Sequence, residues 1–286
     1  MKSVKFFGRS FKFANVAVLS AALFISGCAV APTAPTSEEL AATRDECSRF
    51  RAPFTTISDE RKERIARFAK IGAGVGAVVG QAVARERNQN PLAGALVGAL
   101  AGAAVGATGG YLSDLQERSS STAELQRAIN GDASRDLRQT DRLVTAMTSL
   151  NRCRLQQINQ VERSVRAGGD RDVATAKILQ IRQNVSVDNR VINAVVGDLT
   201  RTRGLYIGAL SQTGANTDNF VSSIQQYQPR VTSPQQTSLQ VNPSQRPQTS
   251  SAVANLGYAE KELSAGAAAH VQTIDAALND LNALLI

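Results

Sequence analysis

Glycines recur at every fourth residue in two neighbouring stretches of the chain, and no other feature constrains the fold as strongly. We call these stretches the glycine ladder; its members are Gly72, Gly76, Gly80, Gly94, Gly98, Gly102, Gly106 and Gly110. Residues four apart lie on one face of an α-helix, so each stretch would form a groove that lets another helix backbone approach closely. Because each helical glycine costs about 1 kcal/mol relative to alanine, the regular spacing predicts close helix contact.

A polar segment, residues 85–91, separates the two stretches and ends in Pro91, which favours the start of a new helix. The ladder therefore predicts an antiparallel helical hairpin over residues 71–112. As a helix, the uncharged run 71–84 would span about 21 Å, less than the ~30 Å of a bilayer core, whereas the run 91–113 is long enough.

The residues before the hairpin favour contact with a membrane. Five basic side chains precede its first segment and two follow it, and all are candidates for binding lipid headgroups: Arg61, Lys62, Arg64, Arg67 and Lys70 before it, and Arg85 and Arg87 after it. We expect a hairpin that associates with a membrane or inserts into it, although glycine and alanine drive insertion only weakly. A soluble hairpin and a flexible Gly/Ala linker are the alternatives, and the strict four-residue period argues against the linker.

The N-terminus resembles a bacterial lipoprotein signal peptide. Four basic residues lie within the first twelve, an uncharged and mostly apolar run follows over 13–25, and the segment closes as Leu23-Phe24-Ile25-Ser26-Gly27-Cys28, similar to a lipobox. The resemblance implies that residues 1–27 are removed and that Cys28 carries acyl chains, which anchor a protein stably when more than one is present. An ordinary signal or anchor with a chance cysteine is the alternative.

The residues after Cys28 indicate in which membrane the lipid anchor is expected to lie. Ala29 stands where an aspartate would, by the same resemblance, favour retention in the inner membrane, so we expect an outer-membrane anchor with the protein facing the periplasm. Residues 28–37 contain two prolines and no charge, which is typical of a short extended tether. Membrane lipid held through Cys28 is thus the first expected partner.

The basic charge of the full chain does not predict nucleic-acid binding. The formal net charge is +8, but residues 1–27 carry four basic residues and no acid, so the remainder carries +4. The remaining arginines alternate with acids along helix-like segments, which is typical of a solvated helix face. We therefore expect no nucleic-acid partner.

Two cysteines remain once Cys28 is lipidated, and an exported location makes a disulfide between Cys47 and Cys153 plausible. Two buried free thiols are the alternative. No Cys-x-x-Cys spacing occurs and the chain has one histidine, His270, so we expect no metal and no cofactor. His270 is interpreted as a packed helix residue.

Most of the chain outside the ladder has helical periodicity. We predict N-terminal helices over 38–70 with a break near Pro53 and a new start at Ser58, and a helical bundle or coiled coil over 113–210 with a stop at Asn130-Gly131 and a turn at 168–170. We further predict a disordered Pro/Gln-rich linker over 211–251 and an amphipathic helix over 252–286.

The bundle's best heptad pattern runs along the residues before the linker: Ile178, Ile181, Val185, Asp188, Ile192, Val195, Leu199, Thr202 and Tyr206. Asp188 could set the register or line a polar cavity, but a local solvent-facing break is the favoured interpretation. The predicted fold class is all-α, with the glycine-ladder hairpin joined to an elongated helical bundle.

A lipobox followed by paired Gly-x-x-x-Gly segments resembles the glycine-zipper outer-membrane lipoproteins typified by the rickettsial 17-kDa surface antigen. The resemblance covers Cys28 and residues 68–112. It implies an envelope lipoprotein whose glycines mediate helix packing. About 170 residues follow the ladder, whereas members of that family are typically small, so the resemblance implies nothing about the C-terminal half.

The sequence favours a protein that is not an enzyme, because no nucleophile elbow accompanies the lone histidine and no phosphate-binding loop ends in Gly-Lys-Ser/Thr. We expect a structural or scaffolding role at the outer membrane, as a homo-oligomer or with an envelope protein, and as part of a secretion or envelope complex. A pore-forming lipoprotein is one alternative. A periplasmic binding module with a cavity around Asp188 is the other.

Overall fold

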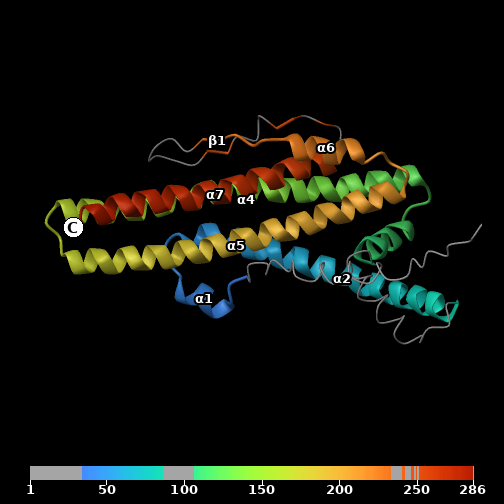
Figure 1. Ribbon diagram of the computed structural model, residues 1–286, viewed down its shortest axis with the longest axis horizontal. Coiled ribbons are helices and arrows are strands. Elements are labelled where there is room, and N and C mark those ends of the chain that lie inside the picture. The colour runs from blue at the N-terminus through green and yellow to red at the C-terminus, as the bar shows by residue number, and fades with distance from the viewer. Residues whose placement is uncertain are drawn as a thin grey trace, which may run out of the picture. The chain divides into compact units, whose positions relative to one another are not determined.

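The computed structural model describes residues 34–86, 106–232, 240–241, 246–247, 249 and 251–285. The described part is almost entirely helical (Figure 1), which confirms the predicted all-α class. Its elements are α1 (Ser37–Ala42), α2 (Ser48–Glu86), α4 (Thr122–Arg166), α5 (Arg171–Gln212), α6 (Asp218–Gln226), β1 (Val231–Thr232), β2 (Gln240–Val241) and α7 (Ala252–Ala283). Residues 106–116 are also helical.

Helices α4 and α5 form a long antiparallel hairpin that organises the described residues. The tight turn between them falls at the predicted position, because Gly168 adopts a φ of 81°, which favours glycine. Asp170 then caps α5, since its Oδ1 accepts hydrogen bonds from the backbone N–H groups of Asp172 and Val173. The turn and the cap together direct α5 back along α4.

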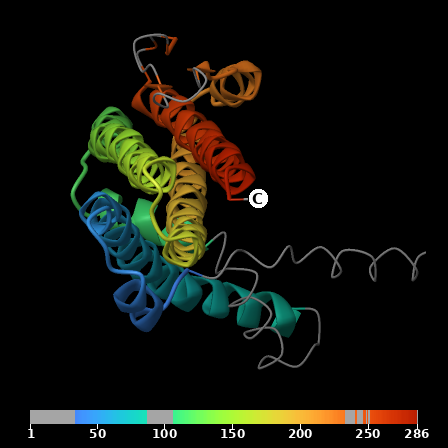
Figure 2. The same cartoon turned by 90° about the vertical axis from the view of Figure 1, so that its left-hand side faces the viewer.

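The other helices cover the two faces of this hairpin. Figure 2 shows α1 and α2 on one side of α4 and α5, with α7 on the opposite side and α6 beyond it. The short antiparallel pair β1–β2 also packs on α7, with Val231 opposite Val241. The order of layers is therefore α1 and α2, then α4 and α5, then α7, then α6 with the strand pair.

The core lies where α4, α5 and α7 meet. All nine residues of the predicted heptad seam of α5 are buried. Ile192, Val195 and Leu199 belong to one apolar cluster with residues of α4 and α7 such as Met147 and Leu263. A smaller apolar cluster, which includes Ile158, Ile178 and Leu278, fills the space near the α4–α5 turn. Burial of these apolar residues drives the association of α4, α5 and α7, because removing apolar side chains from water stabilises the fold.

The first predicted helix break is wrong. Pro53 lies inside α2, and the chain instead breaks between α1 and α2. Proline removes one backbone hydrogen bond and crowds the preceding turn. Here contacts around it hold the helix: Cys47 is in a disulfide, Arg51 binds a buried aspartate, and Phe54 is fully buried.

The predicted stop at Asn130-Gly131 is also wrong, because α4 continues through both residues and the break lies at 117–121 instead. The Asn130 side chain satisfies two backbone groups without ending the helix. Its Nδ2 donates to the carbonyl of Gln126, and its Oδ1 accepts from the N–H of Ala252 at the start of α7. Asn130 thus ties α4 to the beginning of α7.

The predicted disordered linker over 211–251 is wrong for the residues described there. Helix α5 extends to Gln212, α6 follows, and Ile224 of α6 is buried against α7 at Gly257. Arg246 binds Glu262 of α7 and, at 2.9 Å, Asp141 of α4. The prediction failed because it used the Gln- and Ser-rich composition of the segment as a whole. Two side chains, Ile224 and Arg246, are enough to dock its described residues on α7.

Much of the glycine ladder lies outside the described residues. The backbone of α2 is helical through Gly72, Gly76 and Gly80, while Gly94, Gly98 and Gly102 are not described. Gly106 and Gly110 belong to the helical residues 106–116 and are buried against the bundle. In the part of the chain that the structure describes, none of the helices combines the length and hydropathy that a bilayer crossing requires.

Candidate functional site

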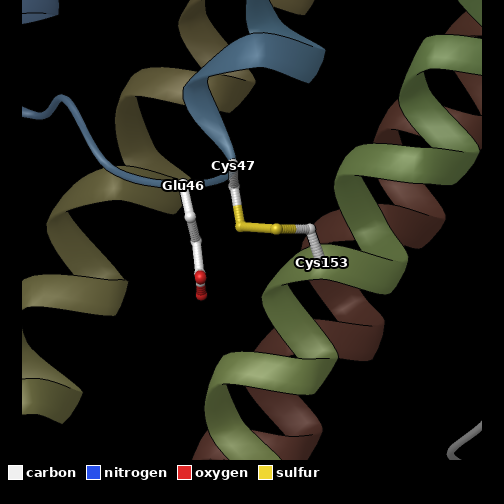
Figure 3. A group of neighbouring side chains, drawn as sticks. All are labelled: Glu46, Cys47 and Cys153. Atoms are coloured by element: carbon white, nitrogen blue, oxygen red, sulfur yellow. A yellow bond between two sulfur atoms is a disulfide. The ribbon is translucent and has the colours of Figure 1, made fainter.

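The two cysteines expected to pair are joined in the structure. Cys47 and Cys153 form a disulfide across a sequence separation of 106 residues, which ties the start of α2 to the middle of α4 (Figure 3). Glu46 lies beside it, so three potential metal ligands come together there. Both sulfur atoms are used in the S–S bond, so this group is a covalent staple and not a set of metal ligands.

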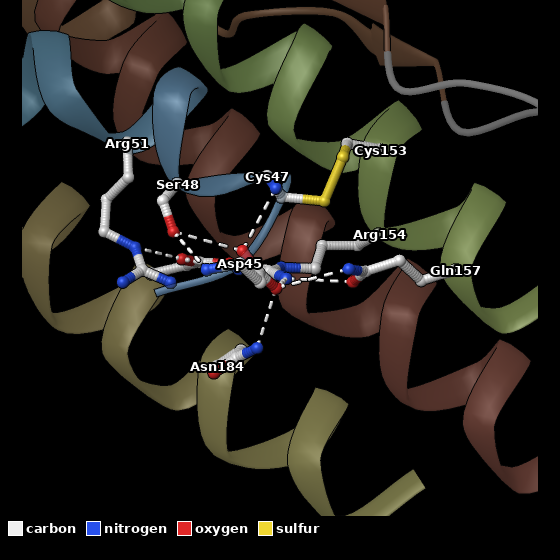
Figure 4. The surroundings of a disulfide bond; sticks show 9 residues. Asp45, Cys47, Ser48, Arg51, Cys153, Arg154, Gln157 and Asn184 are labelled. Atoms are coloured by element: carbon white, nitrogen blue, oxygen red, sulfur yellow. Dashed lines mark hydrogen bonds and ion pairs between the residues drawn. A yellow bond between two sulfur atoms is a disulfide. The ribbon is translucent and has the colours of Figure 1, made fainter. Parts of the chain in front are cut away.

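Asp45, two residues before the staple, is the centre of a dense polar cluster (Figure 4). Its carboxylate accepts hydrogen bonds from the backbone N–H of Cys47, from Asn184 of α5 at 2.7 Å, and from Gln157 and Arg154 of α4. Burial alone would raise the pKa of Asp45, but the hydrogen bond and positive charge of Arg154 outweigh it and lower the pKa. The staple therefore holds an ionised carboxylate between α4 and α5.

Arg154 continues this cluster into the core. Its Nε contacts Oδ2 of Asp188 at 2.7 Å, and Nε of Arg51, from α2, contacts Oδ1 of the same residue at 2.7 Å. Asp188 is fully buried, so the favoured expectation of a solvent-facing break is wrong. The carboxylate is enclosed by two guanidinium groups, an arrangement that supports the register interpretation and leaves no open cavity at its oxygens.

A second buried polar cluster lies farther along the same face of α2. Asp136 of α4 binds Arg64 at 2.8 Å and accepts a 2.6 Å hydrogen bond from the Tyr206 hydroxyl of α5. Burial, followed by the charge of Asp136, raises the pKa of Tyr206, so the phenol remains a donor. Nearby, Ser58 of α2 donates a 2.5 Å hydrogen bond to the buried Asp198 of α5.

This cluster corrects the expectation that Arg61 and Arg64 contact headgroups. Arg61 is fully buried, 4.0 Å from Asp136, and two of its nitrogens, Nε and Nη1, have no hydrogen-bond partner among the described residues. Burial lowers the pKa of Arg61, and the charge of Asp136 only partly offsets this effect. Arg64 is used by the same aspartate, so neither side chain is available to a membrane while α2 is docked.

The inward residues of α2 form what we call the polar seam. Together with Cys47, which directly precedes the helix, they alternate by four and three positions and mix charged with apolar side chains: Arg51, Phe54, Ser58, Arg61, Ile65 and Phe68. This spacing is a heptad pattern, and it was the available signal that sequence reasoning missed because arginine and serine occupy core positions. The seam sets the register of α2 through specific ion pairs as well as apolar packing.

Each buried aspartate along the polar seam also has a partner outside α2. Asp188 binds Arg154 of α4, Asp136 binds Tyr206 of α5, and Asp198 binds Arg201 on its own helix. The α4–α5–α7 body therefore keeps a partner for every one of these carboxylates without α2. Helix α2 is therefore held on this body by the disulfide and by its contacts with these aspartates. Each of these aspartates also has a partner that does not belong to α2.

His270 of α7 is packed in the core, as interpreted from the sequence. Its Nδ1 lies 2.9 Å from Oδ1 of Asn151, and its Nε2 has no hydrogen-bond partner among the described residues. Burial lowers the pKa of His270 to about 4, so the ring is neutral near pH 7.

A cleft of about 480 Å³ lies where α4 and α5 extend beyond the start of α2. Amide side chains, including Gln157, Gln160 and Asn184, line it together with apolar residues such as Ile181. The cleft continues the groove that α2 fills elsewhere. No protein-family model, curated protein or solved structure matches this chain.

Proposed function

We propose that this protein is a lipid-anchored envelope protein with a structural, non-enzymatic role, in which the stapled helical body assembles with copies of itself or with an envelope partner. The observation that carries the proposal is the Cys47–Cys153 disulfide. Disulfides persist in oxidising compartments outside the cytosol, which is where a lipoprotein signal directs a chain. The N-terminal signal and the buried staple, far apart in the sequence, thus favour the same location.

The chemistry of the body also favours a structural role. The buried charged residues are used in pairs that join helices, such as Arg154 with Asp188 and Arg203 with Glu260. In both pairs the carboxylate and the guanidinium come from different helices, so the pair fixes how those helices pack. In the proposed function, the glycine ladder supplies the assembly contact and the stapled body supplies a rigid support.

The test compares wild type with Cys28→Ser in cells given a labelled fatty acid. Acyl incorporation and membrane fractionation should both be lost in the variant, and alkylation without reductant should leave Cys47 and Cys153 unmodified. In-cell crosslinking should give oligomers or a partner complex that Gly98→Leu and Gly102→Leu reduce. An unacylated wild type with free thiols, or crosslinked species unchanged by both glycine substitutions, would contradict the proposal.

A binding role is the second candidate, and the cleft at the α4–α5 turn favours it. Its volume lies within the range of small-molecule sites, and its lining combines amide with apolar side chains. Ala174→Trp would fill the cleft, while the exposed Thr175→Trp is the matched control. Equal envelope phenotypes and crosslinked partners for the two variants would eliminate this candidate.

A further inference from the structure

We propose that the tether from Cys28 holds the helical body side-on against the membrane, so that α1 and the exposed side of α2 form the surface next to the lipid headgroups. We call this surface the anchor face. The inference rests on the lipidation of Cys28 proposed above. It adds a geometry that the anchor alone does not specify.

The chain is attached to the body from the first described residues. Thr36 caps α1, since its hydroxyl accepts from the N–H of Glu39 while its own N–H donates to the Glu39 carboxylate at 2.8 Å. Glu39 in turn binds Arg190 of α5 at 2.9 Å. At the other end of α1, Nη1 of Arg51 donates to the Thr43 hydroxyl at 2.9 Å. Thr36 is therefore a fixed point on the body.

The tether between Cys28 and this fixed point is short. Eight residue steps separate Cys28 from Thr36. Covalent geometry limits this separation to at most about 29 Å. Thr36 cannot lie farther than this from the lipid surface that holds Cys28.

An end-on arrangement would use the whole length of the tether at one end of the body and exceed it at the other. Arg190, which holds α1, lies nineteen residues after the first residue of α5 (Arg171) and twenty-two before the last (Gln212). At 1.5 Å per residue these intervals are about 28 Å and about 33 Å. Standing the body on its α4–α5 turn would need a fully stretched tether, and standing it on the other end would exceed the tether's length.

Contact through the opposite face is also too far. The layers run from α1 and α2, through α4 and α5, through α7, to α6 (Figure 2). Helix axes pack 8–10 Å apart, so three steps amount to about 27 Å, and the radius of α6 adds about 5 Å. Placing α6 on the lipid would hold Thr36 about 32 Å away, beyond the reach of the tether.

The anchor face itself has no charge bias that would select anionic lipid. Its exposed charged side chains include both signs: Glu38, Arg49, Asp59, Glu63, Arg67 and Lys70. Surface contact is therefore imposed by the anchor and not by electrostatic attraction. Binding should be insensitive to the fraction of anionic lipid, and the protein without its anchor should not bind.

The experiment uses full-length lipidated protein in phosphatidylcholine vesicles that contain a nitroxide-labelled headgroup lipid. A fluorescent amino acid replaces Thr56 on the anchor face or, as the matched control, Ser222 on α6; both positions are exposed. Quenching at position 56 should be at least about twofold stronger, because the two layers are separated by about 27 Å and quenching needs close approach. Equal quenching at both positions, or stronger quenching at 222, would overturn the proposal.

A variant with a lengthened tether tests whether the tether causes the expected difference in quenching between positions 56 and 222. Twenty Gly/Ser residues inserted between positions 33 and 34 extend the r.m.s. reach to about 30 Å, with a much longer maximum, and should abolish the difference between positions 56 and 222. A difference that survives the insertion, or that appears only in anionic vesicles, rules the tether out as its cause. Failure of the proposed function is distinguishable, because wild type and Cys28→Ser would then partition into vesicles equally.

Discussion

Removing the disulfide should destabilise the protein strongly and release the start of α2 before the rest of the body. The bond closes a loop across 106 residues, for which the chain-entropy model gives about 5 kcal/mol at 25 °C, an upper value because the unfolded chain retains some structure. Cys47 is fully buried and Cys153 nearly so, which makes the paired change Cys47→Ala with Cys153→Ala the least disruptive substitution.

The expected loss is larger than the effect of the removed sulfur atoms, because the staple also positions Asp45 and its cluster. Without it, Asp45 has a freer backbone, and the hydrogen bonds from Asn184 and Gln157 lose their fixed acceptor. The α4–α5–α7 body should remain folded, since Asp188, Asp136 and Asp198 keep partners outside α2. The change should therefore separate α2 from the body in its stability.

The assay is urea unfolding of wild type and the double-alanine variant, combined with native-state amide exchange resolved by segment. We expect the unfolding free energy to fall by about 3–5 kcal/mol. Amides of residues 48–58 should exchange much faster than those of α4, α5 and α7. A loss below about 1 kcal/mol, or exchange that rises equally in α2 and α7, would refute this account of the staple.

Three further predictions follow from buried groups. Asp188→Ala leaves Arg51 and Arg154 buried without their shared carboxylate, so the free energy of unfolding in urea should fall by about 3–5 kcal/mol. The control Asp172→Ala removes an exposed carboxylate and should lower it by less than about 1 kcal/mol. Similar losses for the two variants would contradict the buried network. His270 has a pKa of about 4 when folded and 6.5 as a free side chain; between these values the unfolded chain binds more protons, so stability should fall by up to about 3 kcal/mol as the pH drops from 6.5 to 4. His270→Gln should reduce this slope, and an unchanged slope would place the titration elsewhere. A Cβ at Gly257 would lie 2.5 Å from Cδ1 of Ile224, so Gly257→Val should loosen α6 and speed proteolysis at 213–230, at a cost of about 1–3 kcal/mol, whereas Gly204→Val, where a Cβ meets open space, should leave cleavage there unchanged.

The polar seam gives α2 an unusual relation to the rest of the fold. Buried ion pairs add little net stability compared with apolar packing, because both charges must leave water. They do penalise misplacement, since a shift of α2 by one turn would leave Arg51 and Arg61 without Asp188 and Asp136. The seam therefore specifies where α2 docks more than it strengthens the docking, and the disulfide supplies the strength.

Local patterns in the sequence determined the parts of the fold that depend on neighbours along the chain. The heptad of α5, the turn at Gly168 and the cap at Asp170 follow from periodicity, backbone freedom and short-range hydrogen bonding, and all are present. Cysteine number, together with the expected compartment, was enough to pair Cys47 with Cys153. The heptad, the turn and the cap need no distant partner, and the cysteine pair could be assigned because only two cysteines remained.

Tertiary contacts decided the rest. Arg51 and Asp188 are 137 residues apart, and neither side chain signals by itself that the other will neutralise it in the core. Pro53 and Asn130 carry local signals for breaks, but long-range contacts outweigh those signals when a helix is held on both sides of the position. The segment after α5 has a composition typical of disorder, yet Ile224 and Arg246 dock it on α7. Short-range rules fail at these positions because the free energy there comes from partners that only folding brings together.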